Sequence, residues 1–124
     1  MNQIELMKRN KKFTLDCLNL AENLRDTRLG NHIRGQIIRS STSVTANYRA
    51  ARLAQSRAAF IAKLSIVIEE ADESEFWIEL GIESGNLNSE KASVLKDEAH
   101  QLTSIYIATR KAMLQRNTTK NNKS

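Results

Sequence analysis

Apolar residues recur at helical spacing in four stretches of this chain, and short polar stretches separate them. Spacings of three and four residues place such side chains on one face of a helix. The pattern predicts helices over residues 14–28, 31–53, 56–83 and 89–115, followed by a flexible polar tail over 117–124. Residue types typical of helix starts and ends lie at these boundaries: Thr14, Asn31, Ser56 and Ser89 at the starts, Gly30, Gly81 and Gly85 at the ends.

The connections between these helices are short, and short connections favour antiparallel neighbours. At 124 residues the chain is sized for one domain. It holds no proline, four glycines and 5% aromatic residues, which suits a mostly helical chain. We therefore expect a single all-α domain, an antiparallel up-down-up-down four-helix bundle.

The second predicted helix has three distinct faces. One is an apolar stripe that also carries Ser40, Ser41 and Asn47, which need hydrogen-bond partners if they are buried. The second face holds small residues that let another helix approach closely: Gly35, Ser43, Ala46 and Ala50. The third is a basic strip that contains Arg34, Arg49 and Arg52.

The third predicted helix carries a second face besides its apolar stripe, including Lys63, Ile66, Glu70, Glu73 and Trp77. A surface helix of a monomer needs one apolar stripe. Tryptophan among residues that can pair across a boundary is typical of protein–protein contacts. We expect these residues to form an oligomer interface, with Arg39 placed to pair with Glu70 or Glu73 across the boundary between subunits. The alternative is that Trp77 lies flat at the edge of the internal core.

Charge is unevenly distributed along the chain. The net charge is +5, but residues 1–63 carry +8 and residues 64–124 carry −3. A basic excess favours polyanions such as RNA or DNA, although ordinary solubility explains it equally well. The candidate phosphate-binding residues are Arg34, Arg49, Arg52 and Arg57. No aromatic residues interleave with these arginines, so base stacking is not expected. A solvated strip or salt bridges between subunits are the alternatives.

The residues that would support catalysis are sparse. Cys17 lies on an apolar face and is expected to be a small buried hydrophobe. His32 and His100 have no evident nucleophile nearby, and one Asp-x-x-His pair at Asp97 falls short of a di-iron set. The string Asp97-Glu98-Ala99-His100 lacks the Gly-rich phosphate loop of a helicase. We expect no enzyme activity, no metal and no cofactor.

The chain shows no sign of export or membrane insertion. Its single cysteine cannot form an internal disulfide, and its first residues lack an apolar signal core. No apolar run approaches the roughly 20 residues that a membrane span requires. The expected location is the cytoplasm.

Residues 36–80 match a family pattern over about 45 positions in register, through these residues: Gln36, Arg39, Ser40, Ser43, Val44, Ala46, Asn47, Tyr48, Ala51, Ser56, Phe60, Lys63, Ile66, Glu70, Ala71, Glu73 and Trp77. The segment resembles the four-helix-bundle family of bacterial large-subunit rRNA intervening-sequence proteins. It is distantly similar to the accessory protein of diversity-generating retroelements, a basic pentamer that works with nucleic acid. The resemblance implies a ring-shaped homo-oligomer, with a pentamer favoured, but no agreed activity.

The chain departs from the family pattern at three positions. Ala59 replaces a usual Asp, which removes a capping box with Ser56. Ala50 and Glu69 change surface charge. Two functions remain: a non-enzymatic accessory protein that binds RNA or DNA through backbone phosphates, or a protein-interaction scaffold without a nucleic-acid role.

Overall fold

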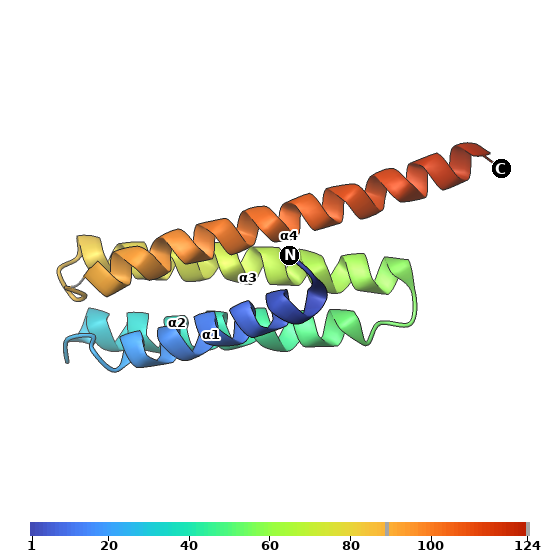
Figure 1. The fold of residues 1–124 in the computed structure, drawn as a ribbon. Coiled ribbons are helices and arrows are strands. Elements are labelled where there is room, and N and C mark those ends of the chain that lie inside the picture. Colours follow the sequence, from blue (N-terminus) through green and yellow to red (C-terminus); the bar gives the residue numbers. More distant parts are fainter. Residues whose placement is uncertain (89, 124) are drawn as a thin grey trace.

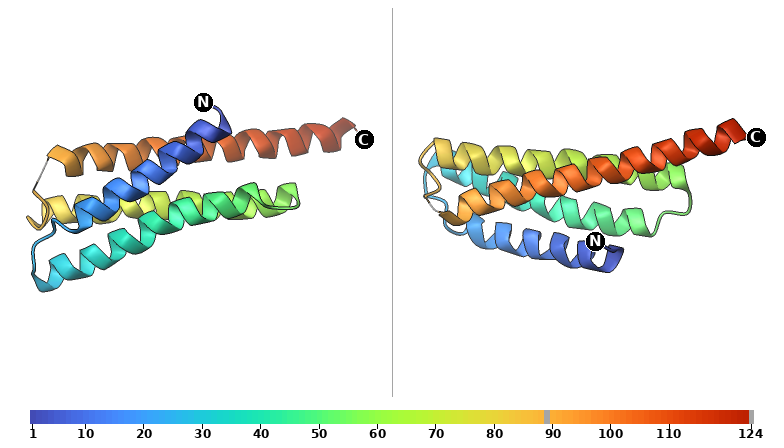
Figure 2. Two further views of the ribbon diagram at one scale, coloured as in Figure 1. Left: turned by 60° about the horizontal axis from the view of Figure 1, so that its bottom comes forward. Right: turned by 45° about the horizontal axis from the view of Figure 1, so that its top comes forward.

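The computed structural model describes the backbone of residues 1–88 and 90–123 and the side chains of residues 1–88 and 90–116. These residues form four helices, α1 (Gln3–Ala21), α2 (Arg28–Arg52), α3 (Arg57–Glu83) and α4 (Glu90–Lys123). The α1–α2 and α3–α4 connections lie at one end, and the α2–α3 connection lies at the other (Figure 1). This arrangement confirms the expected antiparallel four-helix bundle. Helix α4 extends beyond the other three helices (Figures 1 and 2).

Helix α1 begins at Gln3, so the predicted start at Thr14 is wrong. Asn2 caps the helix: its side chain accepts a hydrogen bond from the Glu5 amide at 2.8 Å, and the Glu5 carboxylate accepts one from the Asn2 amide at 3.3 Å. This reciprocal pair satisfies two amides that the first turn leaves unpaired. The earlier start escaped prediction because buried Asn10 interrupts the apolar stripe.

The turn between α1 and α2 also differs from prediction. Helix α1 ends at Ala21 instead of continuing to residue 28, and α2 begins at Arg28 with Thr27 as its N-cap in place of Asn31. Thr27 Oγ1 accepts a hydrogen bond from the Gly30 amide at 2.9 Å. A Cβ atom on Gly30 would lie 2.1 Å from the backbone oxygen of Arg25. Gly30 therefore allows a close approach inside the first turn of α2 and does not end a helix.

The boundaries of α3 agree well with prediction. Ser56 is its N-cap, and its hydroxyl accepts a hydrogen bond from the Ala59 amide at 3.0 Å. Gly85 has a φ of +76°, a conformation that favours glycine, in the turn that follows the helix. Gly81 is buried inside α3.

Helix α4 is described from Glu90, and the expected start at Ser89 lies outside the described residues. The backbone continues as helix to Lys123, past the expected end at residue 115. Ser124 and the side chains of 117–123 also lie outside the described part, so the flexible tail over 117–124 stays a prediction.

The apolar stripes of all four helices meet in one core, whose largest fully buried apolar or aromatic side chains are Tyr106, Phe13, Ile33, Ile37, Leu64, Ile78 and Leu102. Two hydrogen bonds between buried polar side chains join different helices in this core. Ser74 Oγ donates to Ser40 Oγ at 2.9 Å, which joins α2 and α3. Tyr106 Oη donates to the side-chain oxygen of Asn10, which joins α4 and α1. Ser40 thus has the partner that we expected for a buried hydroxyl, whereas the buried Ser41 Oγ has no hydrogen-bond partner among the described residues.

An ion pair also holds α1 against α4. The Arg9 guanidinium donates to both carboxylate oxygens of Glu98, at 2.6 and 2.8 Å. This hydrogen bond is the main reason that the pKa of Arg9 is raised. Among the described residues, no helix is long and apolar enough to cross a membrane.

Candidate nucleic-acid interface

Basic residues gather where α2 ends and α3 begins. Arg49 and Arg52 occupy the last turn of α2, and Arg57 is the first residue of α3. The short connection keeps them at one end of the bundle (Figure 1). Cations are favourable in the last turn of a helix, where its backbone carbonyls concentrate negative charge. The fold thus places three of the four predicted phosphate-binding arginines, Arg49, Arg52 and Arg57, at the α2–α3 end of the bundle.

This end of the bundle contains an open cavity of about 760 Å³. Side chains from all four helices and the α2–α3 connection line it: Gln3, Ala51, Arg52, Ala54, Gln55, Ser56, Arg57, Phe60, Thr109, Ala112, Met113 and Arg116. None of these described lining residues carries a carboxylate. The cavity therefore presents three guanidinium groups without a lining acid, an environment that attracts anions.

Arg116 and Phe60 are among the lining residues that sequence reasoning did not assign to this site. Phe60 was assigned to the core stripe of its helix, and Arg116 lies far along the chain from Arg57. A signal for Arg116 was present in the helix lengths. Residues 57–83 and 90–116 are equally long antiparallel segments, so counting back from their turn places Arg116 level with Arg57.

The structure separates Arg34 from the other candidate arginines. Its guanidinium donates to the backbone oxygens of Ala21 at 2.9 Å and Leu24 at 2.6 Å, and it also contacts Asn31. These contacts tie α2 to the last residue of α1 and to the turn that follows it. Arg34 precedes Arg49 by fifteen residues of helix, which corresponds to about 22 Å along the axis. Arg34 thus has a structural role at the opposite end of the bundle.

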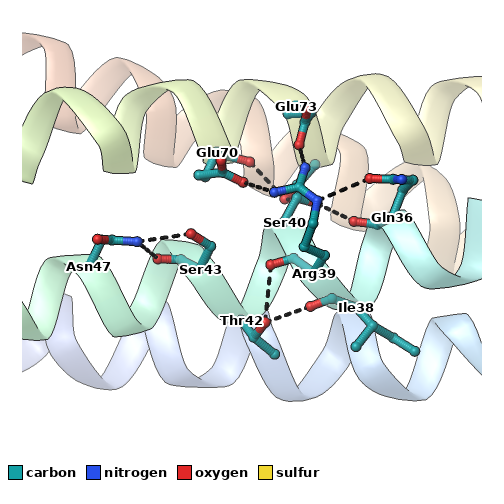
Figure 3. Close-up of polar contacts among 10 residues, drawn as sticks. Gln36, Ile38, Arg39, Ser40, Thr42, Ser43, Asn47, Glu70 and Glu73 are labelled. Atoms are coloured by element: carbon teal, nitrogen blue, oxygen red, sulfur yellow. Dashed lines mark hydrogen bonds and ion pairs between the residues drawn. The ribbon is translucent and has the colours of Figure 1, made fainter.

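The proposed interface arginine, Arg39, forms its ion pairs within the chain. Its guanidinium contacts Glu70 at 3.0 Å and also pairs with Glu73, while Gln36 accepts a further hydrogen bond at 3.0 Å (Figure 3). These contacts join α2 to α3. Arg39 pairs with both glutamates, but between two helices of one chain and not across the subunit boundary that the sequence suggested.

Trp77 lies half-buried against the core on the same side of the molecule. Its ring packs edge-on against His32 and Phe76, with centroid distances of 5.5 and 4.9 Å. Its indole N–H is buried without a hydrogen-bond partner among the described residues. Phe76, in contact with Trp77, leaves 52% of its surface exposed, and Ile66, about three turns earlier on α3, leaves 37% exposed. Trp77 thus meets the core edge and also borders an exposed apolar surface.

The groups considered for catalysis lie apart and are engaged elsewhere. Cys17 is fully buried, and burial raises the pKa of its thiol to about 12. His100 Nδ1 lies 3.0 Å from a carboxylate oxygen of Glu75, and His32 contacts Trp77. In the part of the chain that the structure describes, no three His, Cys, Asp or Glu side chains come together to hold a metal. The thiol, protonated at neutral pH, is a poor nucleophile.

Comparisons with known proteins agree with the fold. Residues 2–108 match the model of the 23S rRNA-intervening sequence protein family. The chain is also similar to a solved structure from Bacteroides thetaiotaomicron VPI-5482, a protein of unknown function from the S23 ribosomal protein family. The two share 33% identity, with a TM-score of 0.78, over 86% of this chain and 98% of the other. Among curated proteins, no relative matched. With its match extending over α1, α2, α3 and half of α4, this chain belongs to the 23S rRNA-intervening sequence protein family.

Proposed function

We propose that this protein is a non-enzymatic nucleic-acid-binding protein that contacts backbone phosphates of RNA or DNA through the α2–α3 end of the bundle. The observation that carries this proposal is the cavity lined by Arg52, Arg57 and Arg116 without a lining carboxylate. Guanidinium groups bind phosphate oxygens with charge-assisted hydrogen bonds, and the released counterions add to affinity.

Arginines elsewhere in the bundle have different surroundings. Arg9 is bound by Glu98, Arg34 by helix carbonyls and Arg39 by Glu70. Their positive charges are already compensated by protein groups, which weakens their attraction for phosphate. The cavity at the α2–α3 end has no carboxylate among its described lining residues, and this end is therefore the better candidate for a polyanion site.

Salt dependence tests this proposal most directly. Three phosphate contacts per chain predict a slope of about −2.7 in a plot of log affinity against log salt, or roughly 40-fold weaker binding between 50 and 200 mM salt. Fluorescence anisotropy with a labelled structured RNA measures both quantities. Absence of salt-sensitive binding at micromolar protein contradicts the proposal.

A matched pair of double variants locates the site. Arg52→Gln with Arg116→Gln removes two charges from the cavity, and we expect the salt slope to fall by about 2. Arg25→Gln with Arg28→Gln removes the same charge near the opposite end of α2, where both residues are exposed. The second pair should retain nearly all of the wild-type affinity. Equal losses in both pairs would indicate a diffuse charge effect instead of this site.

A second candidate function is a protein-interaction scaffold that assembles as a homo-oligomer. We define the Trp77 face as Arg39, Lys63, Ile66, Glu70, Glu73, Phe76 and Trp77. The exposed surface of Phe76 beside Trp77, together with that of Ile66 about three turns earlier on α3, favours this face as a subunit contact. A ring with five subunits is the assembly we propose, because the family resemblance implies it. Under this alternative, Trp77→Ala lowers the mass of the assembly, and the protein shows no salt-sensitive binding to RNA.

A further inference from the structure

The basic cavity contains an aromatic side chain as well as arginines. Phe60 lies in the first turn of α3, packs partly against the hydrophobic core, and lines the cavity beside Arg57. Met113 and Ala112 of α4 extend this apolar wall. The sequence pattern hid this combination, because Phe60 belongs to the core stripe while the arginines lie on other faces.

The dimensions of the cavity suit more than a phosphate group. Its volume of about 760 Å³ falls in the range of roughly 300–1,000 Å³ that holds small organic ligands. Its lining includes Gln55 and Thr109, whose side chains can both donate and accept hydrogen bonds. An aromatic wall, polar side chains and guanidinium groups together match the parts of a nucleotide.

Bases and phosphates require different protein groups. Proteins that bind single strands stack unpaired bases on aromatic rings and hold the backbone with basic side chains. A base inside a duplex is stacked and paired, so it has to leave the helix before it can enter such a cavity. A cavity with both kinds of group therefore discriminates between single strands and duplexes.

We propose that this cavity holds one unpaired nucleotide of a single-stranded nucleic acid, with its base against Phe60 and its phosphates at Arg52 and Arg116. This inference rests on the proposed phosphate-binding function and adds the class of ligand. It makes Phe60 the residue that confers preference for single strands, while the arginines serve single strands and duplexes alike.

Anisotropy with a labelled 12-nucleotide oligo(A) RNA and a labelled 12-base-pair RNA duplex tests the inference. We expect the wild type to bind the single strand more tightly than the duplex. Phe60→Leu keeps an apolar side chain against the core and should weaken single-strand binding by about 5- to 150-fold, the range for loss of one stacked base. Duplex binding by this variant should stay within about twofold of the wild type.

A second variant tests the same inference if Phe60→Leu fails to fold. Ala112 is exposed and lines the cavity, so Ala112→Leu adds bulk there without entering the core. Ala108→Leu makes the same change one turn earlier on α4, at an exposed position outside the cavity lining. We expect the first variant to lose the preference for the single strand and the second to keep it.

The outcomes separate this inference from the function on which it rests. Salt-sensitive binding with equal affinity for single strand and duplex overturns the proposal of a nucleotide pocket and leaves the proposal of phosphate binding intact. A single-strand preference that survives both Phe60→Leu and Ala112→Leu also overturns the pocket. If neither RNA binds, both proposals fail. Unlabelled AMP that competes with the oligo(A) supports direct entry of a nucleotide.

Discussion

At the residue scale, a polar pair in the core joins the first and last helices. Asn10 is fully buried, and its side-chain oxygen accepts the hydrogen bond from Tyr106 Oη. Its backbone oxygen accepts another from Thr45 at 3.0 Å. Burying polar groups is costly unless they are paired, so this contact specifies how α1 aligns with α4.

Removing one member of this pair should cost more than removing both. Tyr106→Phe leaves the Asn10 oxygen buried without its side-chain donor, and we expect unfolding to become easier by about 1–3 kcal/mol. Asn10→Leu combined with Tyr106→Phe replaces both partners by apolar groups and should recover most of this loss. Urea unfolding followed by circular dichroism measures each value. A double variant less stable than both single variants contradicts this account.

The buried thiol of Cys17 makes stability depend on alkaline pH. Burial raises its pKa from 9.0 to about 12, so the thiol stays protonated in the folded chain while it ionises in the unfolded chain. The stabilising effect is complete below pH 9 and is lost as the pH rises toward 12. Between pH 9 and 11, wild type should therefore lose stability relative to Cys17→Ala, by at most about 1.4 kcal/mol per pH unit. Urea unfolding of both proteins across this range gives the difference, and a constant difference contradicts the assignment.

At the scale of the helices, sequence reasoning succeeded wherever local chemistry decides the structure. Apolar spacing and the Ser56 cap fixed α3 almost to the residue. Sequence reasoning failed where the role of a side chain depends on partners that are distant in the sequence. In the sequence, Asn10 interrupts an apolar stripe, and only the structure shows that it binds Tyr106. Gly30 has the residue type of a helix end, and only the structure shows its close approach to the backbone of Arg25.

The same limit applies to the candidate site. Grouping Arg49, Arg52 and Arg57 follows from their proximity along the chain, across one short connection. Arg34 was misassigned because the end of α1 was placed too late, which hid the carbonyls that it binds. The contribution of Arg116 follows from counting back along α3 and α4 from their turn, a step that requires both helices to be placed correctly first.

Two glycines of α2 should respond oppositely to alanine. A Cβ atom at Gly30 would clash with the backbone of Arg25, so Gly30→Ala should destabilise the protein by over 1 kcal/mol. A Cβ atom at exposed Gly35 meets nothing within 4 Å, so Gly35→Ala should stabilise the helix by about 0.5–1 kcal/mol. Thermal unfolding of both variants checks the signs. Stabilisation by Gly30→Ala would show that the turn before α2 relaxes easily.

At the scale of the whole molecule, the basic cavity and the Trp77 face occupy different surfaces. The cavity of the basic end lies among all four helices, while the Trp77 face belongs to α2 and α3. Contacts through the Trp77 face would leave the cavity of each subunit available. A ring would then repeat each weak phosphate site once per subunit, which raises overall avidity for a long strand. Self-association and nucleic-acid binding are therefore compatible properties of one assembly.

Light scattering tests the proposed assembly, for which five chains of 14.0 kDa correspond to about 70 kDa. Trp77→Ala should lower the mass while circular dichroism shows nearly unchanged helix content. Because Trp77 also packs against the core, Phe76→Gln provides a cleaner change: it removes a ring that is 52% exposed. Val94→Gln, at a 65% exposed position on α4, is the matched control and should leave the mass unchanged. A monomeric wild type, or an unchanged mass in both Trp77→Ala and Phe76→Gln, rules out the Trp77 face as the subunit contact.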